Sequence, residues 1–174
     1  MKNKFLIIFF ILFSYLTIFD KLLANDFIFE TSTVEITNKG EVVKATNGSA
    51  TTNDGNIKII ANQFEYNKKL SILKAAGNVT VIDILNELTL KSENILYEVK
   101  NEIIQSNSDS SIIDNLNNLF YLESFSYNLK KKIIKMDEVK VVDSENNKIN
   151  LNKAYLNLNL GRLVGKDMSI DFDN

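Results

Sequence analysis

Four residue types are absent from the sequence: cysteine, histidine, tryptophan and proline. Without cysteine the chain forms no disulfide and offers no thiolate, and without histidine it has no imidazole to bind a metal ion or to act as a base. The Ser-His and Cys-His pairs that activate many nucleophiles are therefore excluded. We expect no enzymatic activity, no metal site and no cofactor.

Arginine is nearly absent, with one residue against 19 lysines. Bidentate recognition of phosphates and guanine edges depends on the planar guanidinium group, which lysine does not replace. The formal net charge is −2, which gives no general attraction to polyanions. We therefore expect no nucleic-acid partner.

One long hydrophobic run is present, at the amino terminus. Two lysines within Met1–Lys4 precede fifteen mostly apolar residues, Phe5–Phe19, and the small residue Ala24 follows. These are the parts of a secretory signal, and the run is shorter than the roughly 20 residues that span a bilayer. We predict a cleavable signal peptide over residues 1–24 and an exported domain over residues 25–174.

An uncleaved membrane anchor from Phe5 to Leu23 is the alternative interpretation of this run. Asp20 and Lys21 would then lie in its last turn, where charge opposes insertion. The whole chain has 45% hydrophobic residues. This is enough apolar side chains for a single core.

An internal repeat of about 30 residues occupies the exported part. Each copy opens with the pattern apolar-x-small-x-x-apolar-x-apolar, and successive copies start 30 or 31 positions apart. A polar turn and a second apolar stretch follow each copy, so each repeat predicts a strand, a turn and a strand. The five copies are anchored at Phe29, Ile59, Leu90, Phe120 and Leu151.

The residue pattern within the repeats indicates strands throughout. Apolar residues alternate with period two, and Val, Ile, Phe and Tyr are frequent. No window after the amino-terminal run sustains the i, i+3, i+4, i+7 spacing of an amphipathic helix. We predict an all-β domain with no helix longer than two turns.

The inward positions change parity inside the repeats. A step of three residues separates them at Ala61–Phe64, at Ser92–Ile95 and at Leu122–Phe125. Side chains alternate strictly between the faces of a strand, so an odd step requires a bulge or a corner at the same place in every repeat. We expect strands that bend there, as in a jelly roll or a solenoid, and not a flat open sheet.

The second and third repeats carry a family resemblance. The strand-like run Ile59–Tyr66 is followed by a short turn, by Ala76–Val81 with its Gly-Asn step, and by Leu88–Ser92. This succession resembles the OstA-like periplasmic domains of the lipopolysaccharide transport system, a group that includes LptA and the N-terminal domain of LptD. The resemblance covers roughly residues 27–172 and rests on a repeating pattern, not on a catalytic signature.

The resemblance implies a twisted β-jelly-roll that takes part in lipopolysaccharide transport and assembly at the outer membrane. It implies lipopolysaccharide as the ligand and other OstA-like Lpt proteins as partners; whether the chain is LptA-like or part of an LptD is left open. Acyl chains would lie in an apolar groove between the strands, although ordinary core packing also accounts for every candidate position. The candidate groove residues are Ile59, Phe64, Tyr66, Leu90, Ile95, Phe120 and Phe125.

The alternative function is that of a structural or adhesive β-repeat protein on the cell surface. Such a protein would have a sealed core, would bind no lipid and would recognise its partners through exposed side chains. Lipid capture by the purified domain distinguishes the two functions.

The acidic residues do not form a recognisable site. No calcium loop of the form D-x-[DN]-x-[DN]-G is present. The neighbours Asp137 and Glu138 would point to opposite faces of a strand, which is poor geometry for the acid and base of glycoside hydrolysis. Four further aspartates fall near expected strand ends, where we interpret them as turn residues: Asp83, Asp109, Asp114 and Asp143.

Two polar segments are expected at the surface. Lys130–Lys132 is the only run of basic residues, and we interpret it as an exposed hairpin turn, with contact to lipid phosphates as the alternative. Ser106–Asn118 is the weakest strand candidate, and we expect a longer surface loop there.

The first and last repeats are expected to leave unpaired strand edges. Neither end carries proline or a dense charge cluster to block pairing with another chain. We expect head-to-tail association by strand addition, with contacts at Phe27–Val34 and Met168–Phe172.

Overall fold

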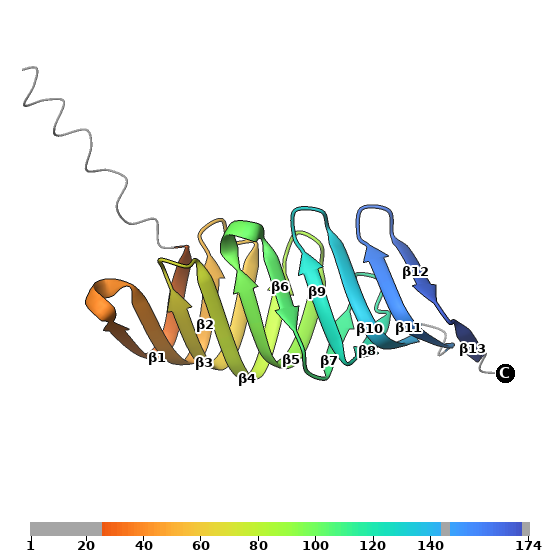
Figure 1. Ribbon diagram of the computed structural model, residues 1–174, viewed down its shortest axis with the longest axis horizontal. Helices are drawn as coiled ribbons and strands as arrows, with labels where there is room; N and C mark the ends of the chain where they lie inside the picture. Colours follow the sequence, from red (N-terminus) through yellow and green to blue (C-terminus); the bar gives the residue numbers. More distant parts are fainter. Residues whose placement is uncertain (1–25, 144–146, 172–174) are drawn as a thin grey trace, which may run out of the picture.

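A computed structural model describes residues 26–143 and 147–171; the expected signal peptide lies outside them. Figure 1 shows a row of strands that follows the chain from one end of the molecule to the other. The strands are β1 (Phe27–Thr37), β2 (Val42–Thr52), β3 (Ile57–Asn67), β4 (Ile72–Asp83), β5 (Leu88–Glu98), β6 (Ile103–Ser106), β7 (Ser110–Ile113), β8 (Leu119–Leu122), β9 (Ser124–Asn128), β10 (Ile133–Val142), β11 (Lys148–Asn157), β12 (Arg162–Lys166) and β13 (Ser169–Asp171).

The described part of the chain is all-β, as the sequence predicts. Its helical elements are two short 3-10 turns, η2 (Asn38–Gly40) and η3 (Val99–Asn101), so the absence of any helix beyond two turns is confirmed there. The strands pair antiparallel in the order β1-β2-β3-β4-β5-β6-β9-β10-β11-β12, and β7, β8 and β13 join the same sheet. Because consecutive strands pair, each repeat adds one hairpin to the growing sheet.

Each long strand contributes to two arms. Residues 133–137 of β10 pair with β9, whereas its residues 140–142 pair with β8. In the same way β5 pairs with β6 through residues 96–98 and with β7 through residues 89–92. We call the half-sheet that contains β7, β8 and β13 the first arm, and the half-sheet that contains β6, β9 and β12 the second arm.

The bends between the arms lie on one line, which we call the corner. The ladder between β3 and β4 shifts between Ile60 and Gln63. Asn47, Asn78 and Glu138 have positive φ of 51°, 51° and 48°, a left-handed conformation that asparagine tolerates better than most residues. The predicted bulge is confirmed, and it makes the residues on both sides of the parity change point inward.

The two arms pack face to face over one core. Phe27 of the first arm lies edge-on to Tyr66 of the second, with ring centroids 5.1 Å apart. Within the second arm, Phe64 lies between Ala45 of β2 and Ala75 of β4. Large rings flanked by small residues let the facing arms interdigitate.

The register of the fifth repeat differs from the sequence alignment. Phe120 pairs with Val141, and Val141 pairs with Ile149, so Ile149 and not Leu151 occupies the first position of that copy. Ala154 then takes the inward position beyond the corner. The prediction was wrong by two residues, because a shift of two preserves the alternation and leaves the hydrophobic pattern unchanged.

The expected loop over Ser106–Asn118 contains a strand. β7 pairs with β5 and β8 and buries Ile112 in the core. The prediction was wrong because its serines do not mark a solvated loop; they bond to one another at the corner and so satisfy their hydroxyls inside the fold. These hydroxyls, joined at 2.8 to 3.0 Å, belong to Ser92, Ser106, Ser108 and Ser110.

Gly48 permits a close approach of β2 to β1 at the corner. A Cβ atom at this position would lie 2.1 Å from the carbonyl oxygen of Glu30 and 2.6 Å from Cα of Thr31. We predict that Gly48→Ala lowers the free energy of unfolding by about 3 kcal/mol, because the backbone of β1 has to move. Urea denaturation measures the change.

Gly161→Ala is the matched control. Gly161, unlike Gly48, has a positive φ, of 57°, and no atom lies within 4 Å of an added Cβ there. Only the backbone conformation is penalised there, at about 1 kcal/mol. A loss of less than about 0.5 kcal/mol in Gly48→Ala would show that the close approach at the corner has no energetic role.

Candidate functional site

The seven candidate groove residues come together in the interior. None is more than 4% exposed, and all belong to one apolar cluster between the arms. The structure shows them packed against one another as core. The first arm contributes Ile59, Leu90 and Phe120, and the second arm contributes Phe64, Tyr66, Ile95 and Phe125.

The interior opens at the N-terminal end of the roll. A cavity of about 500 Å³ there is lined by apolar side chains that include Phe27, Phe29 and Val43, and also by Asn53 and Lys68. Val34 and Ile36 of the edge strand β1 also line it and are 51% and 61% exposed. The apolar interior therefore continues to the molecular surface at this end.

A smaller cavity, of about 180 Å³, lies at the C-terminal end. Phe120 and Val141 of the core line it, together with Ile149, Leu156 and Leu163. Ile149 and Leu163 are only partly buried and pack against the core. Apolar side chains thus follow one another from the first opening, through the core, to the second.

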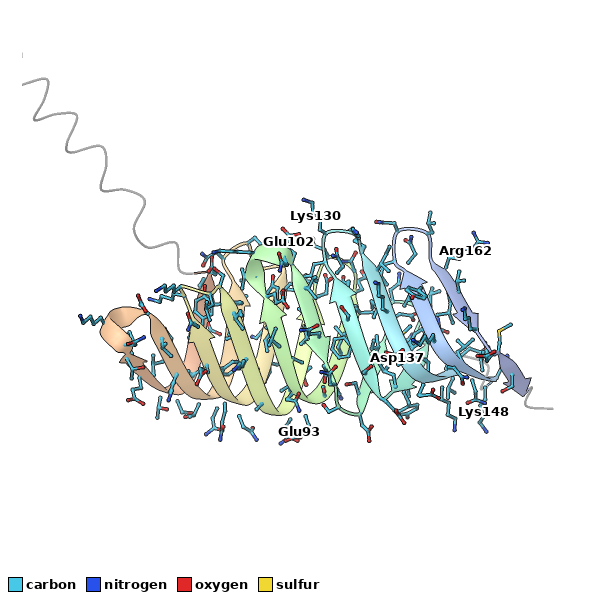
Figure 2. The ribbon with its side chains drawn as sticks, in the orientation of Figure 1. Glu93, Glu102, Lys130, Asp137, Lys148 and Arg162 are labelled. Atoms are coloured by element: carbon cyan, nitrogen blue, oxygen red, sulfur yellow. The ribbon has the colours of Figure 1, made fainter. Side chains whose placement is uncertain are left out.

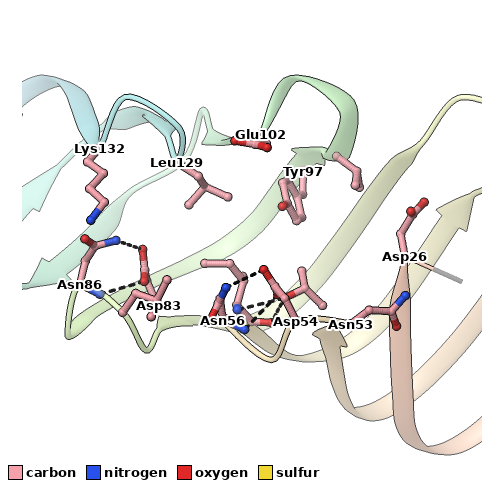
Figure 3. Close-up of a pocket in the computed structure, with 14 residues that line it drawn as sticks. Asp26, Asn53, Asp54, Asn56, Asp83, Asn86, Tyr97, Glu102, Leu129 and Lys132 are labelled. Atoms are coloured by element: carbon pink, nitrogen blue, oxygen red, sulfur yellow. Dashed lines mark hydrogen bonds between the residues drawn. The ribbon is translucent and has the colours of Figure 1, made fainter. Parts of the chain in front are cut away.

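The tips of the arms face each other across a third cavity, of about 430 Å³, which we call the mouth (Figure 3). Loops of the first arm contribute Asp54 and Asp83, and Asp26 lies at the start of β1. Turns of the second arm contribute Glu102 and Lys132. The mouth carries four carboxylates against one ammonium group.

Two tyrosines of the second arm bond to aspartates of the first, and we call these contacts the latches. The hydroxyl of Tyr127 donates to Oδ2 of Asp83 at 2.5 Å and accepts from Nδ2 of Asn86 at 3.1 Å. The hydroxyl of Tyr66 donates to Asp26. Burial, and after it the bonded aspartate, raises the pKa of both tyrosines far above the ordinary value, so both remain neutral donors.

Tyr97 lies in the mouth between the latches. Its ring is 4% exposed and lies 5.8 Å from the ring of Phe27, centroid to centroid. Burial raises the pKa of Tyr97 to about 12, and the charges of Glu102, Asp54 and Asp26 add to the effect. The three carboxylates are therefore close enough to Tyr97 to disfavour its ionised form.

Aspartates expected at strand ends close the loops of the first arm. Asp114 accepts a bond from the amide of Asn118 at 2.9 Å, and Asp143 accepts one from the amide of Asn147 at 2.9 Å. Asp83 bonds to its own loop in the same manner. The turn interpretation is confirmed for these three, and the described residues contain no group of three or more acidic, His or Cys side chains placed to hold a metal ion.

The other polar candidates lie at the surface. Lys130–Lys132 forms the turn between β9 and β10, as expected. Asp109 is exposed before β7, and Asp137 and Glu138 are exposed at the corner. Among the described elements, none is a helix long and apolar enough to cross a membrane.

Comparison with known proteins gives a match of structure without a match of sequence. No protein-family model and no curated protein matches the chain. A solved structure does match: that of LptH, the LptA-homologous periplasmic component of the lipopolysaccharide transport device of Pseudomonas aeruginosa. The TM-score is 0.59 at 12% identity, over 68% of this chain and 95% of LptH. This chain has the LptH fold.

The match to LptH confirms the jelly roll expected from the OstA-like resemblance. The periodic pattern of inward residues, not individual identities, carries this agreement, since only 12% of the aligned residues are the same. The fold is thereby established.

The latches were missed in the sequence. The sequence pattern predicts Tyr66 in the groove and Asp83 in a turn, and it indicates no role for Tyr127 or Asp26. One signal was available: Tyr66 and Tyr127 occupy the last inward position before a polar turn, and a buried tyrosine hydroxyl there needs a partner. The identity of the partner depends on the facing arm, which strand patterns do not reveal.

Removing one latch should destabilise the fold. Tyr127→Phe leaves the carboxylate of Asp83, which is 2% exposed, without its donor across the mouth, so we predict a loss of about 1 to 3 kcal/mol in unfolding free energy. Tyr121→Phe is the control, because Tyr121 is 49% exposed and should change stability by less than about 0.5 kcal/mol.

The same two variants test the pH dependence of stability. Folding raises the pKa of Tyr97 and Tyr127, so between their unfolded value of about 10 and the higher folded values the native chain binds more protons than the unfolded chain. Stability is therefore fully present below pH 10 and falls as the pH rises above it. Urea titrations from pH 8 to pH 12 should show a shallower fall for Tyr127→Phe than for Tyr121→Phe; parallel curves would contradict the assignment.

Proposed function

We propose that this protein shields the acyl chains of lipopolysaccharide during transport through the periplasm toward the outer membrane, without catalysing a reaction. The observation that supports the proposal is the apolar interior that reaches the surface at both ends of an LptH-like roll. LptH is a component of a lipopolysaccharide transport device. Cleavage of a signal peptide over residues 1–24 would deliver the domain to the same compartment.

Acyl chains bind to such an interior through the apolar surface area that they bury and not through polar contacts. Their binding free energy follows the apolar surface that they bury, at about 25 cal/mol per Å². The arms pack directly on each other, so entering chains would replace contacts such as that of Phe29 with Phe64, whose ring centroids are 6.0 Å apart. The acyl chains enter at the N-terminal opening, which is larger than the C-terminal one. When the tips of the arms move apart, the hydrogen bonds of the latches break.

A structural or adhesive protein is the competing function, and the tight packing of the core favours it. Such a protein, however, has no need for apolar side chains at the ends of its roll. Val34 and Ile36 remain exposed beside the N-terminal cavity, at a cost in solubility that a lipid path explains.

The interior position of the lipid can be tested by photo-crosslinking. A photoreactive amino acid at Phe64 or at Phe125 should capture lipopolysaccharide, because both side chains point into the core. The same amino acid at Glu65, which follows Phe64 but is exposed, is the control and should give no adduct. Adducts of equal yield from Glu65 and Phe64 would place the lipid outside the roll.

A substitution in the interior provides a second test. Phe64→Asp should reduce lipid capture at least tenfold, because an unpaired carboxylate among acyl chains is costly. Phe64→Leu should retain most of the capture, since it remains apolar. Circular dichroism confirms that each variant is folded, and a folded Phe64→Asp variant with wild-type capture would contradict the proposed groove.

The ends of the sheet offer a way to join one roll to the next. Among the described strands β1 pairs with β2 alone, and β12 and β13 each pair with β11 alone. Phe27–Val34 is thus on an edge strand as expected, as are Met168's neighbours in β13, while Phe172 lies outside the described residues. We propose that strand addition at these edges joins the openings of successive OstA-like rolls into one path.

Head-to-tail association should depend on the backbone of β1. Ile28→Pro removes an edge N–H and should convert a concentration-dependent assembly into a monomer, as measured by sedimentation velocity. Ile28→Thr is the control: it removes the 55% exposed apolar side chain but keeps the N–H, so association should persist. Loss of association in both variants would indicate a side-chain contact in place of strand addition.

A further inference from the structure

The second arm ends in five hairpin turns that stack on one another. The amide of Lys68 donates to the carbonyl oxygen of Glu41 at 2.8 Å, and the amide of Leu129 donates to that of Glu102 at 2.9 Å. Equivalent bonds of 3.0 and 2.9 Å join the third and fifth turns to the turns before them. We call this row the ridge; it comprises residues 37–41, 67–71, 98–102, 128–132 and 157–162.

The ridge is strongly basic although the whole chain has a net charge of −2. Eight lysine or arginine side chains stand there against three glutamates, and no ion pair joins these cations to any described carboxylate. Consecutive turns are two strands apart, about 10 Å, so the charges form a row; Figure 2 shows Lys130 beside Glu102 on this edge. The cations are Lys39, Lys68, Lys69, Lys100, Lys130, Lys131, Lys132 and Arg162.

The loops at the tips of the first arm carry the opposite charge. Six carboxylates lie there with one lysine, Lys148, among the described residues. Hydrogen bonds from Thr52 and Asn56 lower the pKa of Asp54, which keeps it ionised. The two sides of the mouth therefore differ in sign; the carboxylates are Asp26, Asp54, Asp83, Glu87, Asp114 and Asp143.

We infer that the ridge binds the phosphate groups of the lipid whose acyl chains the roll shields, and so fixes on which side of the mouth the headgroup lies. This inference rests on the proposed function. Lysine ammonium groups attract phosphates as point charges without a fixed geometry, and the carboxylates of the first arm repel them. A lipid would thus enter with its headgroup over the second arm.

The position of the ridge favours a headgroup that emerges from the interior over a separate anionic surface. Lys132 belongs both to the ridge and to the lining of the mouth, and Leu129 and Val99 of neighbouring turns line the same cavity. A phosphate attached to chains held between the arms would reach the ridge directly. A flat membrane would instead meet both tips of the arms, including the acidic loops that repel it.

The test uses two variants with equal changes of net charge. The ridge variant carries Lys68→Gln, Lys69→Gln, Lys100→Gln, Lys130→Gln and Lys131→Gln. The control variant carries the same substitution at five exposed lysines on strands outside the ridge: Lys44, Lys74, Lys91, Lys140 and Lys166. Each is combined with a photoreactive amino acid at Phe125, and capture of bisphosphorylated lipid A is compared with capture of its dephosphorylated form, which has the same acyl chains.

We expect the wild-type chain to capture the phosphorylated lipid about tenfold more strongly at low ionic strength, and this excess to shrink at 0.5 M salt, because exposed charges are screened. The ridge variant should capture both lipids within about twofold of each other, whereas the control variant should keep the wild-type ratio.

Four results would overturn the inference. Equal capture of the two lipids by the wild type, or an unchanged ratio in the ridge variant, removes the ridge from headgroup binding while the proposed function stands, because lipid is still held. Ridge-dependent binding to phosphatidylglycerol vesicles without any preference between the two lipids assigns the ridge to a membrane surface. Failure of the wild type to capture either lipid removes the inference and the proposed function together.

Discussion

The odd step between inward residues is the constraint on which this structure depends. A strand that buries Ala61 and Phe64 on one side cannot remain regular, because residues three apart point to opposite faces. The chain resolves the conflict with a bulge at the same point in strand after strand, and left-handed residues such as Asn78 accept the local backbone conformation. A bend repeated in every strand folds one sheet into two arms that face each other.

The corner also determines where polar groups of one arm can bond to the other arm. Strand ladders and core packing occupy the middle of each arm, so the hydrogen bonds between tyrosines and aspartates of the two arms lie at the tips. At the tips the last inward residue of a repeat is close enough to form a hydrogen bond with the facing arm, as Tyr127 does with Asp83. At the N-terminal edge β1 pairs with β2 alone among the described strands, and apolar residues such as Ile36 remain exposed.

The same geometry explains how a chain with 12% identity keeps the fold of LptH. What has to persist is the spacing of inward positions and the corner, and many apolar residues satisfy both. Stability then comes from neighbouring hairpins, each of which supports the next through the ladder and through stacked turns such as that of Lys68 on Glu41. The charged side chains on the turns do not take part in the strand ladder or the core. They can therefore contact a headgroup without a loss of stability.

The sequence by itself determined the all-β class, the repeat, the corner and the inward direction of residues such as Phe64 and Phe125, because strand side chains alternate locally. It did not determine the register of the fifth repeat, where Ile149 and not Leu151 pairs with Val141, because a shift of two residues leaves that alternation intact. The sequence did not predict strand β7 either. Its serines are polar, and their hydrogen-bond partners are known only once β5 and β6 are placed beside it.

The latches, the polar mouth and the opposed charges of its two sides were decided only by the tertiary structure. Each of them joins residues from different arms, such as Tyr66 and Asp26, 40 positions apart. Patterns along a strand report which face a side chain takes, but not which segment lies opposite. That information arises when the bent sheet closes on itself, because the pairing of distant tips depends on the summed bend and stacking of all the hairpins between them.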